Sequence, residues 1–141
     1  MRKRLVAAAL AALIVCAALA SAGGGVAGAK SKPVKKTVTM RDNYYSPAKL
    51  TITPGSTVTW KTPVDIGDSH DVKLTKGPKG ATFTYISPDS GKKVTKTKLQ
   101  SPPYASGPAK FVVTGFTKPG KYHFICTFHE TEMQMDITVK K

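Results

Sequence analysis

Turn signals recur along the chain from Val34 onward at intervals of about eight to twelve residues, the spacing expected of short, turn-connected strands. Each signal contains glycine or proline, as in Pro54-Gly55, and the runs between them are rich in β-branched and aromatic residues. Residues 57–61 and 133–140 alternate apolar and polar side chains, a pattern that buries one face of a strand. The sequence therefore predicts an all-β fold, a sandwich or a barrel.

The start of the chain follows a different pattern. Basic residues at positions 2–4 precede an apolar run over residues 5–20, and Ala20-Ser21-Ala22 has the form of a signal-peptidase site. The apolar run is shorter than the ~20 residues that a membrane-spanning helix needs. We predict that residues 1–22 are a signal peptide, with cleavage possible up to residue 29. The mature protein would then be exported, periplasmic or extracellular, without stable membrane insertion; an uncleaved anchor and a lipid on Cys16 are the alternatives.

The rest of the chain divides into a short leader and one domain. Residues 23–33 are small and glycine-rich, which is typical of a flexible segment. Residues 34–141 are enough to close one hydrophobic core without the help of disulfides. We expect a monomeric single-domain protein.

The chain is strongly basic. Its formal net charge is +14, and removal of residues 1–22 leaves 19 basic against 8 acidic residues, or +11. Such a charge favours partners with acidic surfaces. For residues 92–98 we favour a simpler role, because lysines on an exposed strand prevent edge-to-edge pairing. That stretch contains no aromatic residue for stacking on bases, which argues against nucleic-acid binding.

Cysteine is the most informative residue type in the composition. The chain has two cysteines, and cleavage of the signal would leave only Cys126. A single cysteine in an oxidising compartment cannot form an internal disulfide. It is therefore buried and inert, paired with another chain, or a ligand.

Its neighbours favour a ligand. Cys126, His129 and Met133 lie within eight residues, with the cysteine at the end of one predicted strand and the methionine at the start of the next. Upstream, His70 follows the loop at residues 65–69 and precedes another predicted strand. Thiolate, imidazole and thioether are the donors that soft copper prefers, and two histidines, a cysteine and a weak axial methionine form a blue-copper site.

Three motifs extend this interpretation to nearly all of residues 34–141. They are the Tyr45-Ser46-Pro47 sequence, the turn and Val-x-Trp strand of residues 54–60, and a Tyr-x-Phe-x-Cys-x-x-His run over residues 122–129. With these motifs the chain resembles the cupredoxin family, the plastocyanin- and amicyanin-like type 1 blue copper proteins. The resemblance implies a Greek-key β-sandwich of about eight strands.

The resemblance also implies a ligand set. It assigns His70, Cys126 and His129 as copper ligands and Met133 as the axial sulfur, with Met135 as the competing candidate. Asp71 follows the first histidine where the family usually has asparagine, a departure that bears on the rigidity and potential of the site.

The implied function is one-electron transfer between redox protein partners, without catalysis. The copper enzymes of this fold add a site with several further histidines, and beyond the two assigned histidines only His123 remains, which alternation places toward solvent. Phe128, with Pro63 and Ile66 on the facing loop, is a candidate apolar contact patch. The alternative function is an envelope copper carrier or storage protein.

Overall fold

The computed structural model describes residues 31–64, 67–87, 90–105 and 107–141. The predicted signal peptide, most of the leader and Ile66 lie outside these residues. Strands are the only regular elements in the described ranges: β1 (Lys35–Arg41), β2 (Tyr44–Ser46), β3 (Lys49–Ile52), β4 (Thr57–Lys61), β5 (Lys73–Lys76), β6 (Phe83–Ile86), β7 (Lys93–Lys96), β8 (Lys110–Thr114), β9 (Gly120–Ile125) and β10 (Gln134–Val139).

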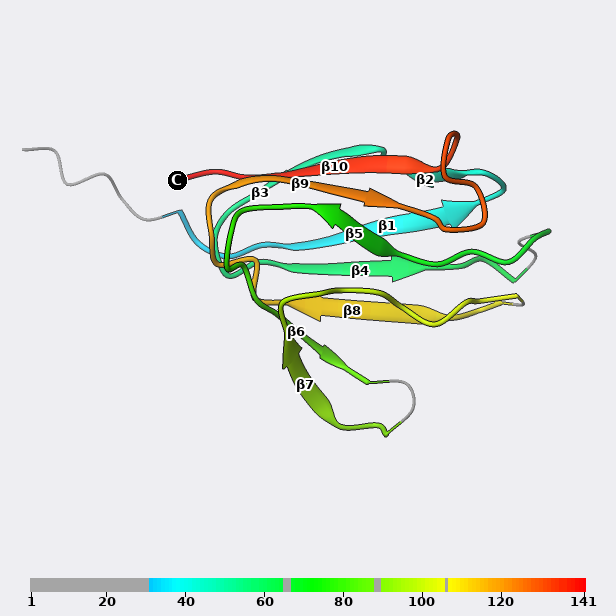
Figure 1. Ribbon diagram of the computed structural model, residues 1–141, viewed down its shortest axis with the longest axis horizontal. Coiled ribbons are helices and arrows are strands. Elements are labelled where there is room, and N and C mark those ends of the chain that lie inside the picture. Colours follow the sequence, from blue (N-terminus) through cyan, green and yellow to red (C-terminus); the bar gives the residue numbers. More distant parts are fainter. Residues whose placement is uncertain (1–30, 65–66, 88–89, 106) are drawn as a thin grey trace, which may run out of the picture.

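The strands form two sheets that face each other. One sheet has the order β2-β1-β4-β8-β6-β7 and the other the order β3-β10-β9-β5. Most neighbouring strands are antiparallel, but β1 pairs with β4, and β3 with β10, in parallel. In Figure 1 the layer of β10, β9 and β5 lies over β1, β4 and β8, and the β6–β7 hairpin extends from one side. The prediction of an all-β sandwich is confirmed.

Alternation along the strands supplies the core. The buried residues of β9 and β10 are every second one, and Trp60 of β4 reaches across to Phe124 of β9 with ring centroids 5.3 Å apart. Trp60 is fully buried and donates its indole N–H to the sulfur of Met135 at 3.3 Å. The two sheets are therefore joined by aromatic packing and by a buried polar contact in the same layer.

The strand count differs from the expected eight, because ten strands form. The additions are β2, which has only three residues, and β6, which lies in a segment with few large apolar residues. Phe83 and Tyr85 alternate within β6 and are buried, so this short strand has enough apolar surface to join the sheet.

The described ranges contain no helix of the length and apolar character needed to cross a membrane.

Candidate metal centre

Cys126 lies just past the end of β9. It continues the alternation of that strand, in which Tyr122 and Phe124 face the core, and it is fully buried. Its backbone N–H donates to the carbonyl of Met133 at 3.0 Å, just before β10 begins. The loop between the two strands is thus closed at its base, with the Cys126 sulfur inside.

A tight turn within this loop brings His129 back to the cysteine. The His129 N–H donates to the Cys126 carbonyl at 3.3 Å, and the His129 carbonyl accepts from the N–H of Met133 at 2.8 Å. As a result the Nδ1 atom of His129 lies 3.8 Å from the Cys126 sulfur. The C-x-x-H spacing is therefore short enough for both donor atoms to reach one metal ion.

His70 comes to the same point from the other side of the sandwich end. Its backbone exchanges two hydrogen bonds with Tyr104, of 3.0 and 2.8 Å, in an isolated bridge ahead of β5. The side chain is fully buried, and its Nδ1 atom lies 3.9 Å from the Cys126 sulfur. Two segments more than fifty residues apart in the sequence thus supply one cluster.

The spacing of these donors fits one metal ion. With the ligand distances typical of zinc, about 2.3 Å for sulfur and about 2.05 Å for nitrogen, a trigonal arrangement places the two donors about 3.8 Å apart. The observed sulfur to nitrogen distances are 3.8 and 3.9 Å. Among the His, Cys, Asp and Glu side chains of the described residues, one group of three or more has donor atoms that all lie within 4.8 Å of one another. That group is His70, Cys126 and His129.

The two methionines have different surroundings. Met133 is fully buried and forms backbone hydrogen bonds with both Cys126 and His129, so it belongs to the ligand loop itself. Met135 is buried on β10, where its sulfur accepts the hydrogen bond from Trp60. The sulfur of Met135 is therefore engaged in the core, two positions along the chain from the loop.

Asp71 ties the His70 segment to the cysteine loop. Its carboxylate accepts from the Thr127 N–H at 2.6 Å and from the Thr127 hydroxyl at 2.8 Å, and Gln100 donates to it at 3.2 Å. Its own N–H points at the Cys126 sulfur at 3.5 Å. The residue that departs from the family pattern thus makes a buried, charge-assisted link across the site.

Tyr45 makes a further hydrogen bond to Asp71. Its hydroxyl donates to the Asp71 carbonyl at 2.5 Å from a fully packed position on β2. Burial raises the pKa of the Tyr45 hydroxyl, and the nearby Cys126 and Asp71 raise it further, so it stays a neutral donor. The sequence motif that contains Tyr45 was recognised, but this contact was not predictable, because nothing in the sequence pairs Tyr45 with Asp71.

Burial also raises the pKa of the Cys126 thiol, while backbone hydrogen bonds from Asp71, Phe128 and His129 oppose the shift. A thiol in such a place is unreactive by itself. A metal ion changes this, because coordination to a thiolate releases the proton.

His123 lies outside the cluster. Its Nδ1 atom is 2.9 Å from a carboxylate oxygen of Asp136 on the neighbouring strand, and this hydrogen bond lowers the pKa of Asp136. The side chain is partly exposed, as expected from its phase in β9.

The ligand cluster approaches the surface through His129. The side chain of His129 is 16% exposed, with its Nε2 atom 3.9 Å from a carboxylate oxygen of Asp68. The adjacent Phe128 is 51% exposed, and Val64 on the facing loop is 79% exposed. Phe128 of the predicted contact patch is thus on the surface, Pro63 is half-buried, and Ile66 lies outside the described residues.

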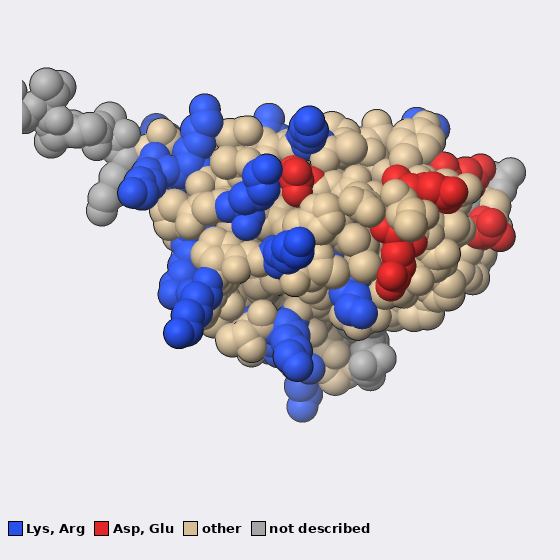
Figure 2. All heavy atoms as spheres, turned by 45° about the horizontal axis from the view of Figure 1, so that its top comes forward, with Lys and Arg blue, Asp and Glu red and all other residues tan. Residues whose placement is uncertain are grey.

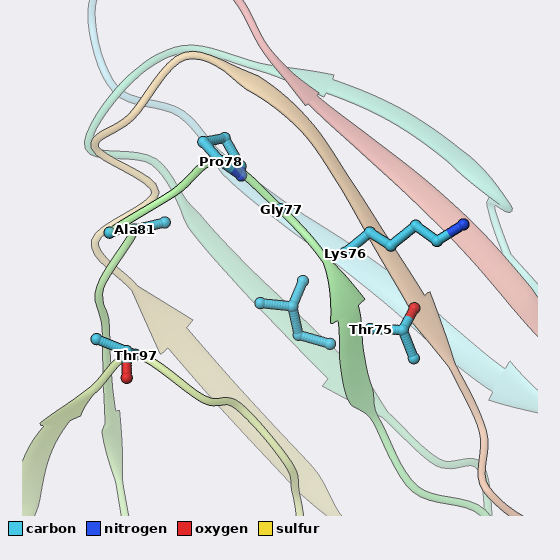
Figure 3. A pocket seen from close by; sticks show the side chains of 8 residues that line it. Thr75, Lys76, Gly77, Pro78, Ala81 and Thr97 are labelled. Atoms are coloured by element: carbon cyan, nitrogen blue, oxygen red, sulfur yellow. The ribbon is translucent and has the colours of Figure 1, made fainter.

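The hollow in Figure 3 is a different feature. It is lined by Leu74, Thr75, Lys76, Gly77, Pro78, Gly80, Ala81 and Thr97, around the connection from β5 to β6. None of the four predicted ligands lines it, so it plays no part in the metal cluster.

Comparisons with known proteins agree with this chemistry. The family described as "Copper binding proteins, plastocyanin/azurin family" matches residues 32–140. No curated protein sequence matches the chain.

Solved structures share the fold at low sequence identity. A reduced amicyanin mutant has a TM-score of 0.53 and 22% identity over 75% of this chain and 82% of its own. A purple cupredoxin from Nitrosopumilus maritimus has a TM-score of 0.52 and 21% identity over 74% of this chain and 99% of its own. The "blue" copper protein auracyanin A from Chloroflexus aurantiacus has a TM-score of 0.51 and 20% identity over 77% of this chain and 100% of its own.

The family match spans nearly the whole described domain, and the donor set is the one that copper of the type 1 class requires. Copper is therefore the cofactor, and the chain belongs to the plastocyanin/azurin family of copper-binding proteins.

Proposed function

We propose that His70, Cys126 and His129 hold a single copper ion, with Met133 as a weak axial ligand, and that the protein carries one electron at a time between redox proteins. The observation that carries this proposal is the buried cluster in which two histidine nitrogens lie 3.8 and 3.9 Å from one cysteine sulfur. Met133 is preferred to Met135 because the sulfur of Met135 already accepts the indole N–H of Trp60.

The bound copper supplies a change between Cu(I) and Cu(II), and the chain supplies a site that does not rearrange during that change. Asp71 links the segments that bear His70 and Cys126 through its hydrogen bond with Thr127, and Tyr45 holds Asp71 from β2 through a buried hydrogen bond. Because these hydrogen bonds hold both segments, they oppose movement of the ligands when the oxidation state changes. A rigid site of this kind favours fast electron exchange.

The path for the electron leads through His129. Of the three clustered ligands, His129 alone is not fully buried, and exposed Phe128 beside it gives a partner an apolar surface to contact. We infer that redox proteins dock at this end.

Catalysis is not part of the proposal. Among the described residues only one cluster fits a metal, and His123 is engaged with Asp136. A copper-containing nitrite reductase from Thermus scotoductus shares the fold at a TM-score of 0.50, but this chain covers only 23% of it. That likeness is one of fold, and the carrier role rests on the single metal cluster among the described residues.

We further propose that the protein is exported to the periplasm or the extracellular space, as the pattern of residues 1–22 predicts, and that it acts as a monomer.

Absorption spectroscopy and voltammetry of the same Cu(II)-loaded preparation test the function. We expect a strong visible band from the thiolate bond and a reversible one-electron wave. A protein that binds Cu(II) without a strong visible band would contradict the type 1 site. A band with no reversible wave, together with rapid release of Cu(I) to a chelator, would instead support the copper carrier or storage function.

A further inference from the structure

Most of the described acidic side chains lie at one end of the sandwich, and exposed lysines crowd the other end. Figure 2 shows the acidic groups gathered on one side and most of the lysines on the other. We define the metal end as the end at which β9 finishes and β10 begins, where the acidic residues are Asp42, Asp68, Asp71, Glu130 and Glu132. Five of the eight acidic residues of the chain therefore lie near the metal cluster.

The opposite end carries exposed lysines. It is formed by the first residues of β1, the turn between β3 and β4, the connections that precede β6 and β9, and the residues that follow β10. We define the lysine end by seven exposed residues at these places: Lys32, Lys35, Lys36, Lys79, Lys118, Lys140 and Lys141.

Contacts between these segments show that they form one surface. The Thr53 hydroxyl donates to the Lys32 carbonyl at 2.6 Å, which joins the start of the domain to the turn before β4. The Lys118 ammonium donates to the Lys79 carbonyl at 2.9 Å, which joins the connections before β6 and β9. The lysines are thus brought together by packing of four separate chain segments.

No carboxylate side chain among the described residues neutralises this surface. Asp136 on β10 pairs instead with His123 at 2.9 Å and with Lys121 at 3.7 Å. Lys121 is therefore left out of the lysine end as defined here. The seven lysines remain a patch of one sign, which attracts anions more strongly than scattered charges of the same number.

We propose that the lysine end binds the anionic headgroups of a lipid bilayer, so that the metal end faces away from the membrane. This goes beyond the proposed electron transfer but rests on the proposed export, and vesicle binding measured without copper tests it separately from the metal site. Clusters of four to eight basic residues are the size of patch that anionic leaflets attract.

The path of the chain favours a membrane over a soluble acidic partner. Residue 31 enters the domain at the lysine end, and only ten residues of sequence separate it from the apolar run at residues 5–20. If that run remains attached to a membrane, it holds this end of the domain nearest the bilayer. The same orientation leaves Phe128 and His129 open to redox partners at the far end.

Two sets of charge variants of the full chain test the proposal. The first changes lysine-end residues, with Lys35→Glu, Lys36→Glu, Lys118→Glu and Lys140→Glu together. The matched control changes four exposed lysines elsewhere, with Lys61→Glu, Lys92→Glu, Lys93→Glu and Lys110→Glu. Both sets alter the net charge equally and keep the same apolar run. Any difference in binding between them is therefore due to the position of the substituted lysines. A third set places glutamine at the lysine-end positions, which removes the positive charges without adding negative ones. Circular dichroism checks that all variants are folded.

Binding is measured by co-sedimentation with vesicles of phosphatidylcholine alone and of phosphatidylcholine with phosphatidylglycerol. On the anionic vesicles we expect the lysine-end variant to lose at least about tenfold in partition coefficient and the control to lose about threefold or less. On phosphatidylcholine all proteins should behave alike, because only the apolar run contributes there. Added salt should reduce the difference between the two sets.

Two results would overturn the proposal. Equal losses in both variant sets would show that net charge alone acts. A lysine-end effect seen with soluble polyglutamate but not with anionic vesicles would assign the surface to an acidic protein or polymer. Orientation has its own readout: a water-soluble oxidant should react with the vesicle-bound copper protein as fast as with the free one. A rate reduced tenfold or more on vesicles would place the metal end against the lipid.

Discussion

The metal end and the lysine end close the same two sheets, yet they are built in different ways. At the metal end, buried polar groups such as Asp71 and His70 hold the loops together, and Phe128 and Val64 are exposed. At the lysine end, the strands are joined by short connections, and exposed ammonium groups surround them. The core between them serves both ends, so the chemistry of each can differ without any change of fold.

This difference changes how the net charge should be interpreted. The +11 of the chain without residues 1–22 led to the expectation of partners with acidic surfaces. That expectation stays a prediction, and the acidic residues Asp68, Glu130 and Glu132 near His129 argue against it for a partner that docks at the metal end. We infer that a redox partner carries basic groups around its own contact surface.

The largest expected effect separates the metal from the fold. Cys126→Ser should abolish the strong visible band, because a hydroxyl cannot supply the soft thiolate ligand. The β-sandwich should persist, since serine has nearly the same volume as cysteine. Absorption spectroscopy with added Cu(II) and far-UV circular dichroism check both statements. A visible band that survives the substitution would remove Cys126 from the site.

The second prediction tests whether the hydrogen bonds of Asp71 make the stability of the protein more sensitive to substitution at the metal end than at a surface ion pair. Asp71→Ala in the metal-free protein leaves the part-buried N–H and hydroxyl of Thr127 without their acceptor and removes a carboxylate that is itself buried, and an unsatisfied buried group costs about 1–3 kcal/mol. We expect a loss of about 2–4 kcal/mol in the free energy of unfolding, measured by urea denaturation.

Asp136→Ala is the matched control, because this carboxylate is partly exposed and its ion pairs are at the surface. Such pairs contribute about 1 kcal/mol or less. Asp71→Asn should recover most of the loss, since the amide oxygen can still accept the Thr127 N–H. Equal losses for both alanine variants would contradict a special structural role for Asp71.

The sequence predicted the fold and the cluster well where the signal was local. Residues 57–61 are predicted as a strand and form β4, and Cys126 and Met133, predicted at the end of one strand and the start of the next, directly flank β9 and β10. The strand β6 was missed because its neighbours are glycine, proline and lysine, although the alternation of Phe83 and Tyr85 was a usable signal.

Other features depend on contacts between distant segments. Gln100 and Thr127 meet at Asp71 across the metal end, and no periodicity in the sequence relates them. The separation of charge arises in the same way, because it depends on which turns gather at which end. Only the assembled sandwich shows that most of the carboxylates gather at one end and that the lysine end has none among its described residues.

The third prediction compares two methionines, Met133 in the ligand loop at the metal end and Met135 in the core. Met133→Leu should keep copper bound and raise the reduction potential, because a weak axial ligand tunes the potential more than it holds the metal. Met135→Leu should leave the potential unchanged and cost about 1.5 kcal/mol or less, from repacking and the lost contact with Trp60.

Voltammetry and thermal melts of the same copper-loaded preparations make this comparison. A potential that moves with Met135→Leu and stays fixed with Met133→Leu would reverse the axial assignment.

The smallest expected effect concerns the rate of electron exchange with a small anion such as hexacyanoferrate(III). It depends on the distance over which the charges at each end can change that rate. The six-residue strands β9 and β10 separate the two ends by about 20 Å at ~3.3 Å per residue. That distance is twice the Debye length of about 10 Å at 0.1 M ionic strength, but less than the length of about 30 Å at 0.01 M.

At 0.1 M, therefore, only the acidic groups near His129 should influence an anion at the metal end. Removing them with Glu130→Gln and Glu132→Gln should speed the exchange by about two- to fivefold, while Lys35→Gln and Lys36→Gln should change it by less than about 1.5-fold. At 0.01 M the lysine-end pair should begin to slow the reaction, because the attraction of the distant lysines is no longer screened. Stopped-flow rates at both ionic strengths measure this. If the lysine-end pair has the larger effect at 0.1 M, electron exchange does not take place through the metal end alone.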